Sequence, residues 1–307
     1  MPMVFSLIIP TFNRAASLRA CLQALCNIEY SMCEWEIIVV DDGGAQPLGA
    51  LINEFASRLP IQLLRQENSG PAAARNRGAQ NARGEFLAFT DDDCAPDKLW
   101  FRHLEISLRK HPRALVGGHT INALRDNPYA STSQLLIDYL YEQWNAQSQD
   151  AQFFASNNMA MRRKDFLELG GFDTAFTLAA SEDREWCERW LASSRVLVYA
   201  PDVTIRHAHN LTLRSLWRQH FAYGRGAWQF HQARASRGGT FWKPRLSFYT
   251  RLLRFPLTKA RHKQTNHRPL VLMALLFLTQ FAALTGFLFE KRQANQHFAR
   301  ANCEYSE

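Results

Sequence analysis

The chain has 307 residues, 47% of them hydrophobic, with six scattered cysteines and a formal net charge of +8. These values are typical of a globular protein with one large or two ordinary domains, and they exclude a small disulfide-rich scaffold. The cysteines form no CxxC pair, so we interpret them as reduced thiols in a cytosolic setting.

The charge is distributed unevenly along the chain. The first 202 residues carry 19 basic and 25 acidic side chains, whereas residues 203–289 contain 14 Lys and Arg and no Asp or Glu. An acidic body joined to a basic segment indicates that the basic part meets an anionic surface.

Apolar runs alternate with helical periodicity in the N-terminal part of the chain. The run over residues 4–9 is too short for a signal peptide and predicts a buried strand. Further strands are expected at 36–40, 61–64 and 86–89, with helices at 18–25, 48–55 and 71–82 between them. This alternation predicts an α/β fold with a mostly parallel, doubly wound sheet.

Polar residues follow three of the predicted strands. The segments Thr11–Arg14, Asp41–Gly44 and Asp91–Asp93 are all strand-to-helix loops in this interpretation, so they lie on one edge of the sheet and can converge on one ligand. Without a cation, three adjacent carboxylates raise one another's pKa, and carboxylates at this position suit a divalent ion that bridges phosphates. A solvated acidic turn or helix cap is the alternative.

Four segments, in this order and spacing, resemble motifs of the family 2 glycosyltransferases of the GT-A fold. They are Ser-Leu-Ile-Ile-Pro-Thr-Phe-Asn-Arg at 6–14, Val-Val-Asp-Asp-Gly-Gly at 39–44, Gly-Pro-Ala-Ala-Ala-Arg-Asn-Arg-Gly at 70–78 and Phe-Thr-Asp-Asp-Asp at 89–93. Gly170–Asp173 and Ser181–Asp183 extend the resemblance to about residue 210. Gly44 stands where the family commonly has Ser.

The resemblance implies a site for a nucleotide-sugar donor and a divalent metal. Asp42 would hydrogen-bond the nucleobase, and Asp91 and Asp93 would hold Mn²⁺ or Mg²⁺ against the diphosphate. Asn157 could reach the donor sugar, although a plain turn is the alternative there. The candidates for donor binding are Pro10, Thr11, Phe12, Arg14, Asp42, Arg75, Asp92 and Asn157.

Glu182 and Asp183 open a stretch with helical periodicity. Acidic residues favour a helix N-terminus, so they need no further role. The resemblance, however, implies that Asp183 is the base that takes the proton of the acceptor hydroxyl, with Glu182 as the second candidate. In-line displacement assisted by one carboxylate implies inversion at the anomeric carbon. Upstream, Asp165 is expected to cap a helix that ends at Gly170.

His207 and His209 follow another predicted strand. In this fold a histidine here can be a third metal ligand, and packing or surface histidines are the alternative. We expect the two rings to point to opposite sides of the extended chain, so that one of them, His207, faces the site. Between these motifs we expect a helix near residues 99–108, a strand at 114–118 and an amphipathic helix at 130–149 that packs on the body or forms an acceptor-side wall.

The C-terminal part combines a basic, aromatic segment with an uncharged one. Residues 211–268 interleave Arg and Lys with Trp, Phe and Tyr, and residues 270–289 carry no charge. Twenty apolar residues can span a bilayer, with a buried helix as the alternative. The basic side predicts that the catalytic body is cytoplasmic at an inner membrane. Basic residues interleaved with aromatic ones can also bind single-stranded nucleic acid, but the apolar run that follows favours a membrane surface.

These observations predict a catalytic GT-A domain over 1–210, with a nucleotide-binding part at 1–118 and an acceptor part at 119–210. A basic membrane-proximal segment (211–268), a transmembrane or membrane-embedded helix (269–290) and a tail (291–307) would follow. The expected activity is metal-dependent, inverting transfer of a sugar from a UDP-, GDP- or dTDP-sugar to a glycan, lipid-linked or other membrane-associated acceptor. A catalytically silent nucleotide-sugar-binding protein of the same fold is the alternative.

Overall fold

The computed structural model describes residues 2–146, 150–240, 246–258 and 265–304, with side chains up to residue 296. The strands are β1 (Phe5–Thr11), β2 (Trp35–Asp41), β3 (Ile61–Arg65), β4 (Phe86–Phe89), β5 (Cys94–Pro96), β6 (Ala114–Asn122), β7 (Met159–Arg162) and β8 (Val196–His207). The helices are α1 (Ala15–Leu25), α2 (Gly49–Phe55), α3 (Pro71–Asn81), α4 (Trp100–Lys110), α5 (Pro128–Trp144), α6 (Arg163–Glu168), α7 (Glu182–Ala192), α8 (Leu213–Ser236), α9 (Leu246–Arg254) and α11 (Pro269–Glu304), with 3₁₀ turns η1 (Ser156–Asn158) and η2 (Phe255–Leu257).

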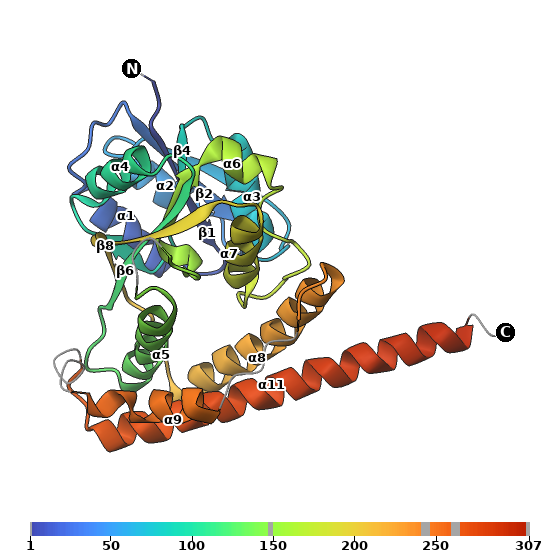
Figure 1. Ribbon diagram of the computed structural model, residues 1–307. Coiled ribbons are helices and arrows are strands. Elements are labelled where there is room, and N and C mark those ends of the chain that lie inside the picture. Colours follow the sequence, from blue (N-terminus) through green and yellow to red (C-terminus); the bar gives the residue numbers. More distant parts are fainter. Residues whose placement is uncertain (1, 147–149, 241–245, 259–264, 305–307) are drawn as a thin grey trace. The chain divides into compact units, whose positions relative to one another are not determined.

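The chain divides into two compact units (Figure 1). Unit 1 comprises Met1–Leu124, Leu140–Thr177 and Asp183–His209, and unit 2 comprises Arg125–Tyr139, Leu178–Glu182 and Asn210–Glu307. Parts of the predicted membrane-proximal segment (241–245 and 259–264), the end of the predicted helix at 130–149 (147–149) and the last tail residues (305–307) lie outside the described residues.

Unit 1 contains an eight-stranded sheet in the order β3-β2-β1-β4-β7-β6-β8-β5. The first four strands of this order are parallel, and β7 and β5 are the antiparallel members. Parallel pairing brings the carboxyl ends of β1, β2 and β4 to the same edge. The predicted mostly parallel α/β sheet is thereby confirmed.

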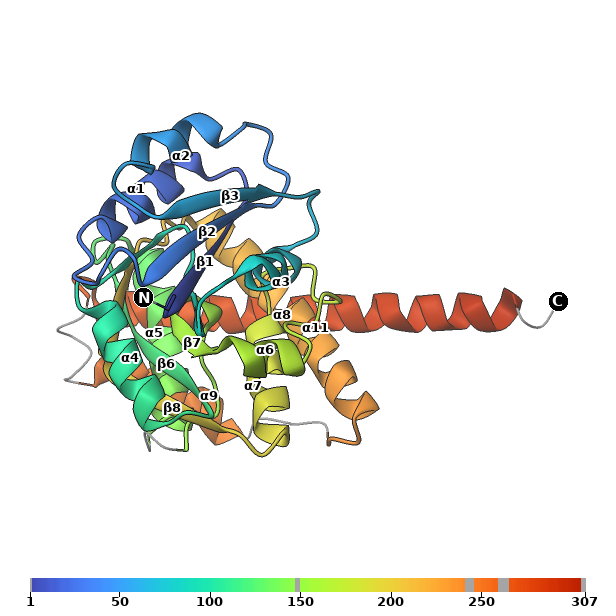
Figure 2. The ribbon, with the colours of Figure 1, turned by 90° about the horizontal axis from the view of Figure 1, so that it is seen from above.

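Helices cover both faces of this sheet, which explains why β1 is apolar at consecutive positions. Phe5, Leu7 and Ile9 belong to the core that also includes buried residues of α1, α2 and α4. On the opposite face Gly78 of α3 lies against Ile8, so closely that a Cβ there would come within 2.4 Å of the Ile8 Cγ2 atom. Figure 2 shows α1 and α2 on one side of β1–β3 and α3 on the other.

Three elements differ from the sequence-based expectation. The strands β5 and β7 were not predicted, and the predicted strand at 114–118 continues to Asn122 as β6. Asp165 does not cap a helix: it lies inside α6, whose N-cap is Arg162, and its carboxylate pairs with Arg195 Nη2 at 3.2 Å. That buried ion pair gives Asp165 a partner that helix periodicity alone does not reveal.

Unit 2 is helical. Thr212 and Ser215 form a reciprocal capping box at the start of α8. The helix α11 continues to Glu304, beyond the predicted apolar helix of 269–290, and its Pro269–Gln296 part is long and apolar enough to cross a membrane by length and composition alone.

Candidate active site

Two backbone segments are joined directly at the carboxyl edge of the sheet. The N–H group of Asp42, which follows β2, donates a hydrogen bond to the carbonyl oxygen of Thr11 at 2.9 Å. The hydroxyl group of Thr11, the last residue of β1, donates to Asp92 Oδ2 at 2.7 Å. The predicted convergence of the three loops is therefore present in the structure.

The three consecutive aspartates have different surroundings. Asp91 is partly exposed and accepts a hydrogen bond from Arg75 Nη2 at 2.8 Å. Asp92 is buried, and Arg14 Nη1 lies 3.2 Å from its carboxylate. Asp93 is buried as well, and it pairs with Arg14 Nη2. A solvated acidic turn is thus excluded for Asp92 and Asp93.

These surroundings shift two of the carboxylates in opposite directions. Burial, reinforced by the charges of Asp93 and Asp91, raises the pKa of Asp92 to about 7 against the opposing effects of Arg14 and Thr11. Burial alone would also raise the pKa of Asp93, but the hydrogen bond and charge of His207, together with Arg14, hold that pKa below its ordinary value. The expected mutual raising is present at Asp92, whereas at Asp93 the two cationic partners determine the direction of the shift.

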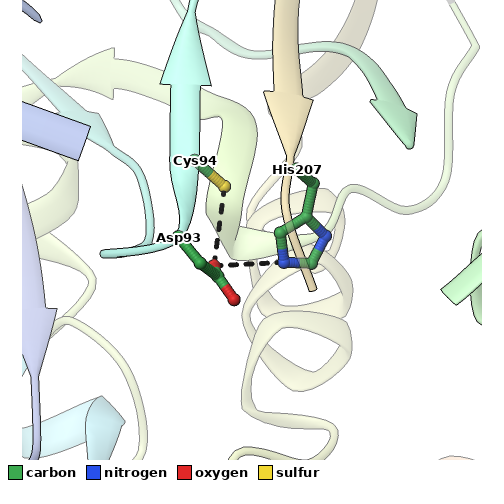
Figure 3. Close-up of side chains that lie close together, drawn as sticks. All are labelled: Asp93, Cys94 and His207. Carbon is green, nitrogen blue, oxygen red and sulfur yellow. Dashed lines mark hydrogen bonds and ion pairs between the residues drawn. The ribbon is translucent and has the colours of Figure 1, made fainter. Parts of the chain in front are cut away.

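The short strand β5 brings His207 to the acidic cluster. Cys94 of β5 is the register partner of His207 of β8, and the N–H of Ala208 donates to the carbonyl oxygen of Asp93 at 2.9 Å. His207 Nε2 consequently lies 3.1 Å from Asp93 Oδ1 (Figure 3). Burial would lower the pKa of His207, but Asp93 raises it above its ordinary value.

His207 and His209 do not point to opposite sides. Their rings stack with centroids 5.1 Å apart. The expectation was wrong because residues two apart on an extended chain share a face. Burial and the neighbouring charge of His207 lower the pKa of His209 to about 4.

The donor atoms near Asp93 fit a divalent cation. Ligand atoms of Asp93, Cys94 and His207 all lie within 4.8 Å of one another (Figure 3). Carboxylate oxygens suit Mn²⁺ and Mg²⁺, and an imidazole nitrogen is a common transition-metal ligand. Asp91, with 30% of its side chain exposed, leaves a second carboxylate accessible beside this group. Cys94 was not singled out from the sequence, and a cysteine directly after three aspartates was the available signal.

Asp42 organises the loop between β3 and α3. Its Oδ1 accepts hydrogen bonds from Gln66 Nε2 at 2.7 Å and from the N–H of Ser69 at 2.9 Å, and its Oδ2 accepts one from the N–H of Gly70 at 2.9 Å. Gly70 has a φ of +87°, and a Cβ there would lie 2.5 Å from the carbonyl oxygen of Thr177, so only glycine fits. Sequence reasoning missed Gln66 and Ser69, since neither lies in a recognisable pattern.

The loop after β1 exposes an aromatic side chain to solvent. Phe12 is 45% exposed, whereas Pro10 is half-buried in the strand. Asn13 has a φ of 56°, and its Oδ1 accepts a hydrogen bond from the N–H of Ala45. This contact links the loops that follow β1 and β2, and Asn13 was also not predicted as a site residue.

The remaining candidates lie in the later part of the chain. Asp183 is the second residue of α7 and lies in unit 1, and its Oδ1 accepts a hydrogen bond from the N–H of Arg184. Burial raises the pKa of Tyr141, and the charge of Asp183 adds to that rise. Asn157 is buried in η1 and lies 3.5 Å from the hydroxyl group of Thr120. Glu182 is buried.

Comparison with known proteins adds three findings. Chondroitin synthase of Escherichia coli is 28% identical over 214 residues, which cover 59% of this chain and 31% of that protein. Glycosyltransferase AglE of Haloferax volcanii is 28% identical over 225 residues, 72% of each chain. The structure of the mannosyltransferase PcManGT from Pyrobaculum calidifontis in complex with GDP-Man and Mn²⁺ shares the fold, with a TM-score of 0.64 at 19% identity over 96% of this chain and 88% of that one.

The chain thus spans about a third of the chondroitin synthase that it matches. A family model described as glycosyl transferase family 2 matches residues 6–170, more than half of the chain and the part that supplies β1, β2, β4 and the three aspartates. The chain belongs to the glycosyl transferase family 2.

Proposed function

We propose that this protein is a metal-dependent, inverting glycosyltransferase. It would transfer a sugar from a nucleotide sugar to a saccharide, a lipid-linked glycan or another membrane-associated acceptor. The observation that carries this proposal is the pairing of Asp93 with His207 at the sheet edge where the loops after β1 and β2 also end, with Asp91 two residues before Asp93. The carboxyl edge of a parallel sheet is where such folds bind nucleotides, and these side chains could hold a cation beside one.

The residues at the carboxyl edge of the sheet would each contribute to binding a nucleoside diphosphate donor. The hydrogen bonds that Asp42 accepts fix the Gln66–Gly70 loop, and Phe12 offers an exposed ring beside it. The guanidinium groups of Arg14 and Arg75 lie against the aspartates, where phosphate oxygens are also within reach of their donors. Mn²⁺ or Mg²⁺ held by Asp91, Asp93 and His207 would neutralise the charge that develops on the leaving diphosphate.

Relatives of the same fold support this class of donor. PcManGT was solved with GDP-Man and Mn²⁺, and S. aureus TarS was solved with UDP-GlcNAc, at a TM-score of 0.52. Which base and which sugar this chain binds is a separate question, since both similarities are below 25% identity.

In the proposed reaction, one C–O bond forms and one breaks at the anomeric carbon, and the acceptor hydroxyl gives up its proton. The acceptor oxygen attacks the anomeric carbon while the bond from that carbon to the diphosphate oxygen breaks on the opposite side, which inverts the configuration. Asp183 takes the proton of the acceptor hydroxyl, with Glu182 as the second candidate. We place the catalytic unit on the cytoplasmic side of an inner membrane, because the basic residues of 203–268 suit the anionic lipids of that leaflet.

A screen of UDP-, GDP- and dTDP-sugars for Mn²⁺-dependent donor hydrolysis and transfer tests this function. The variants Asp93→Asn and Asp183→Asn should each lose at least about 10²-fold in transfer while keeping the circular dichroism spectrum of the wild type. Asp93→Asn should also lose the dependence on Mn²⁺, and Asp183→Asn should retain it.

Two results would contradict the proposal. Full activity of both variants would remove the assigned roles. Nucleotide binding by calorimetry without turnover of any donor would instead favour a catalytically silent protein of the same fold.

A further inference from the structure

We propose that α8 and α11 form a two-helix layer that lies in the plane of an anionic lipid surface, rather than anchoring the chain through one spanning helix. This inference concerns unit 2 alone and does not depend on the proposed activity. It rests on how the apolar side chains of α11 are divided between a covered and an open face.

One face of α11 is buried and the opposite face is open. The buried positions follow helical spacing and are Leu272, Leu276, Thr279, Ala282 and Gly286. The large exposed side chains on the opposite face recur every three, four or seven residues and are Leu270, Phe277, Phe281, Leu284 and Leu288, each between 44% and 74% exposed. The open face therefore leaves one apolar stripe of α11 uncovered, as a helix that lies on a lipid surface does.

The covered face of α11 packs against α8. A Cβ on Gly224 of α8 would lie 1.9 Å from the carbonyl oxygen of Ala283, and a Cβ on Gly286 would lie 2.0 Å from that of Phe221. The backbones therefore approach each other at two glycines, one on each helix.

The two helices run in the same direction. The rings of Trp217 and Phe281 are 6.0 Å apart, and further along both helices Arg225 Nε pairs with Glu290 at 2.6 Å. Gln229 Nε2 also donates to Glu290 at 2.8 Å. This register fixes which part of α8 lies at the level of each part of the apolar run.

The register argues against a spanning position. The uncharged run is Leu270–Phe289, so Phe281 lies close to its middle. Arg214 and Arg218, exposed on α8, flank Trp217 and would therefore lie near the centre of the bilayer if α11 crossed it. Arginines at this depth are strongly disfavoured. In the plane of the surface, the same arginines reach the headgroups while the stripe enters the acyl boundary.

The positive charge of this part of the chain favours anionic lipid as the partner. No Asp or Glu occurs from residue 203 to 289, and Arg251 and Arg254 of α9 are exposed in the same unit as Arg214 and Arg218. Phosphate headgroups complement this surface. A second copy of the chain would bring an equal set of arginines toward it, so self-association along the stripe is disfavoured.

Flotation of the full-length protein with vesicles tests the surface. Binding to vesicles with 30% phosphatidylglycerol should exceed binding to pure phosphatidylcholine at least tenfold and weaken as NaCl is raised. The double variant Phe281→Glu/Leu284→Glu should lose at least tenfold in binding. The matched control Gln293→Glu/Asn295→Glu adds the same charge at exposed polar positions beyond the stripe and should bind like the wild type.

A labelling experiment separates the in-plane position from a spanning one. Asn266→Cys, just before the start of α11, and Gln296→Cys, at the end of its apolar part, are both exposed; they are made in a Cys33→Ser/Cys303→Ser background and expressed in bacteria. In intact spheroplasts a membrane-impermeant maleimide should label neither position, and after lysis it should label both. Labelling of one position in intact spheroplasts would overturn the proposal in favour of a spanning helix. A soluble dimer that ignores vesicles and dissociates in Phe281→Glu/Leu284→Glu would overturn it in favour of a second copy.

Discussion

Asp92 and Asp93 are neighbours in the chain, yet their carboxylates have different partners. Thr11 and one guanidinium nitrogen face Asp92, whereas a guanidinium and an imidazole face Asp93. The first carboxylate is therefore easy to protonate in the folded protein, and the second is not.

The raised pKa of Asp92 predicts a pH dependence of stability. The folded protein keeps this proton up to about pH 7, whereas the ordinary value is 3.8. Between these values the folded state binds more protons than the unfolded chain, so this group lowers stability as the pH rises. In EDTA, the melting temperature of Asp92→Asn should therefore fall less between pH 5 and pH 8 than that of the wild type. At pH 8 the folded variant should be more stable than the wild type by roughly 1–3 kcal/mol.

Differential scanning fluorimetry at several pH values measures this difference. If the melting temperatures of the two proteins changed with pH in the same way, Asp92 would already be ionised at pH 5 in the folded state.

His207 should matter for metal affinity more than its neighbour. His207→Gln should raise the Mn²⁺ concentration needed for half-saturation about tenfold or more, because the imidazole nitrogen beside Asp93 is lost. His209→Gln, which alters the ring stacked on His207, serves as the matched control and should change affinity less. Calorimetric titration of Mn²⁺ in the presence of a nucleoside diphosphate gives both values, and equal losses would argue against a ligand role for His207.

At this scale the sequence singled out, as candidates, the residues that belong to strong patterns. Asp42, Asp91, Asp93 and His207 follow strands or match family motifs, so they could be named. Gln66 could not, because its hydrogen bond to Asp42 depends on how the loop after β3 folds back. The stacking of His209 on His207 was missed through a wrong assignment of strand faces.

Among the elements, β6 depends on a glycine for its packing. A Cβ on Gly117 would lie 2.1 Å from Cγ of Phe154, a fully buried ring. Gly117→Ala should destabilise unit 1 by about 1–3 kcal/mol through overpacking. Gly49→Ala, where nothing lies within 4 Å of the added methyl, should be neutral or slightly stabilising. Thermal melts of both variants test this difference in stability. Equal changes in melting temperature would contradict the prediction.

Long elements with clear periodicity were predictable, and short ones were not. The strands β1, β2 and β4 are continuous apolar runs, and α3 begins at Pro71 as expected. The strand β5 has three residues, too few for a period, and its existence depends on pairing with β8 more than a hundred residues later. The strand β7 was not predicted either, because it is defined by its pairing with β4 and β6, which are distant in the sequence.

For the whole molecule, ligand binding should appear as added stability. If Mn²⁺ and a nucleoside diphosphate bind the folded state, saturation at 100 times the dissociation constant adds about 2.7 kcal/mol, or a few degrees in melting temperature. The wild type should show this shift only with both ligands present, and EDTA should abolish it. Asp93→Asn should show a much smaller shift, and an undiminished one would place the cation elsewhere.

The overall class followed from the sequence because strand order, charge separation and motif order agree with one another. The acceptor did not, since its binding surface depends on the arrangement of side chains from distant segments. The charge separation also indicated an anionic surface, but the open stripe on α11 became visible only once its contacts with α8 were known.

The pairing of Cys94 with His207 has a consequence for biosynthesis. The imidazole emerges from the ribosome long after the aspartates and can join them only when β8 docks onto β5. A nascent chain that ends before β8 therefore carries the acidic residues without their histidine partner. If Mn²⁺ binds at this site as proposed, such intermediates should hold it loosely, and its capture would be one of the last events of maturation.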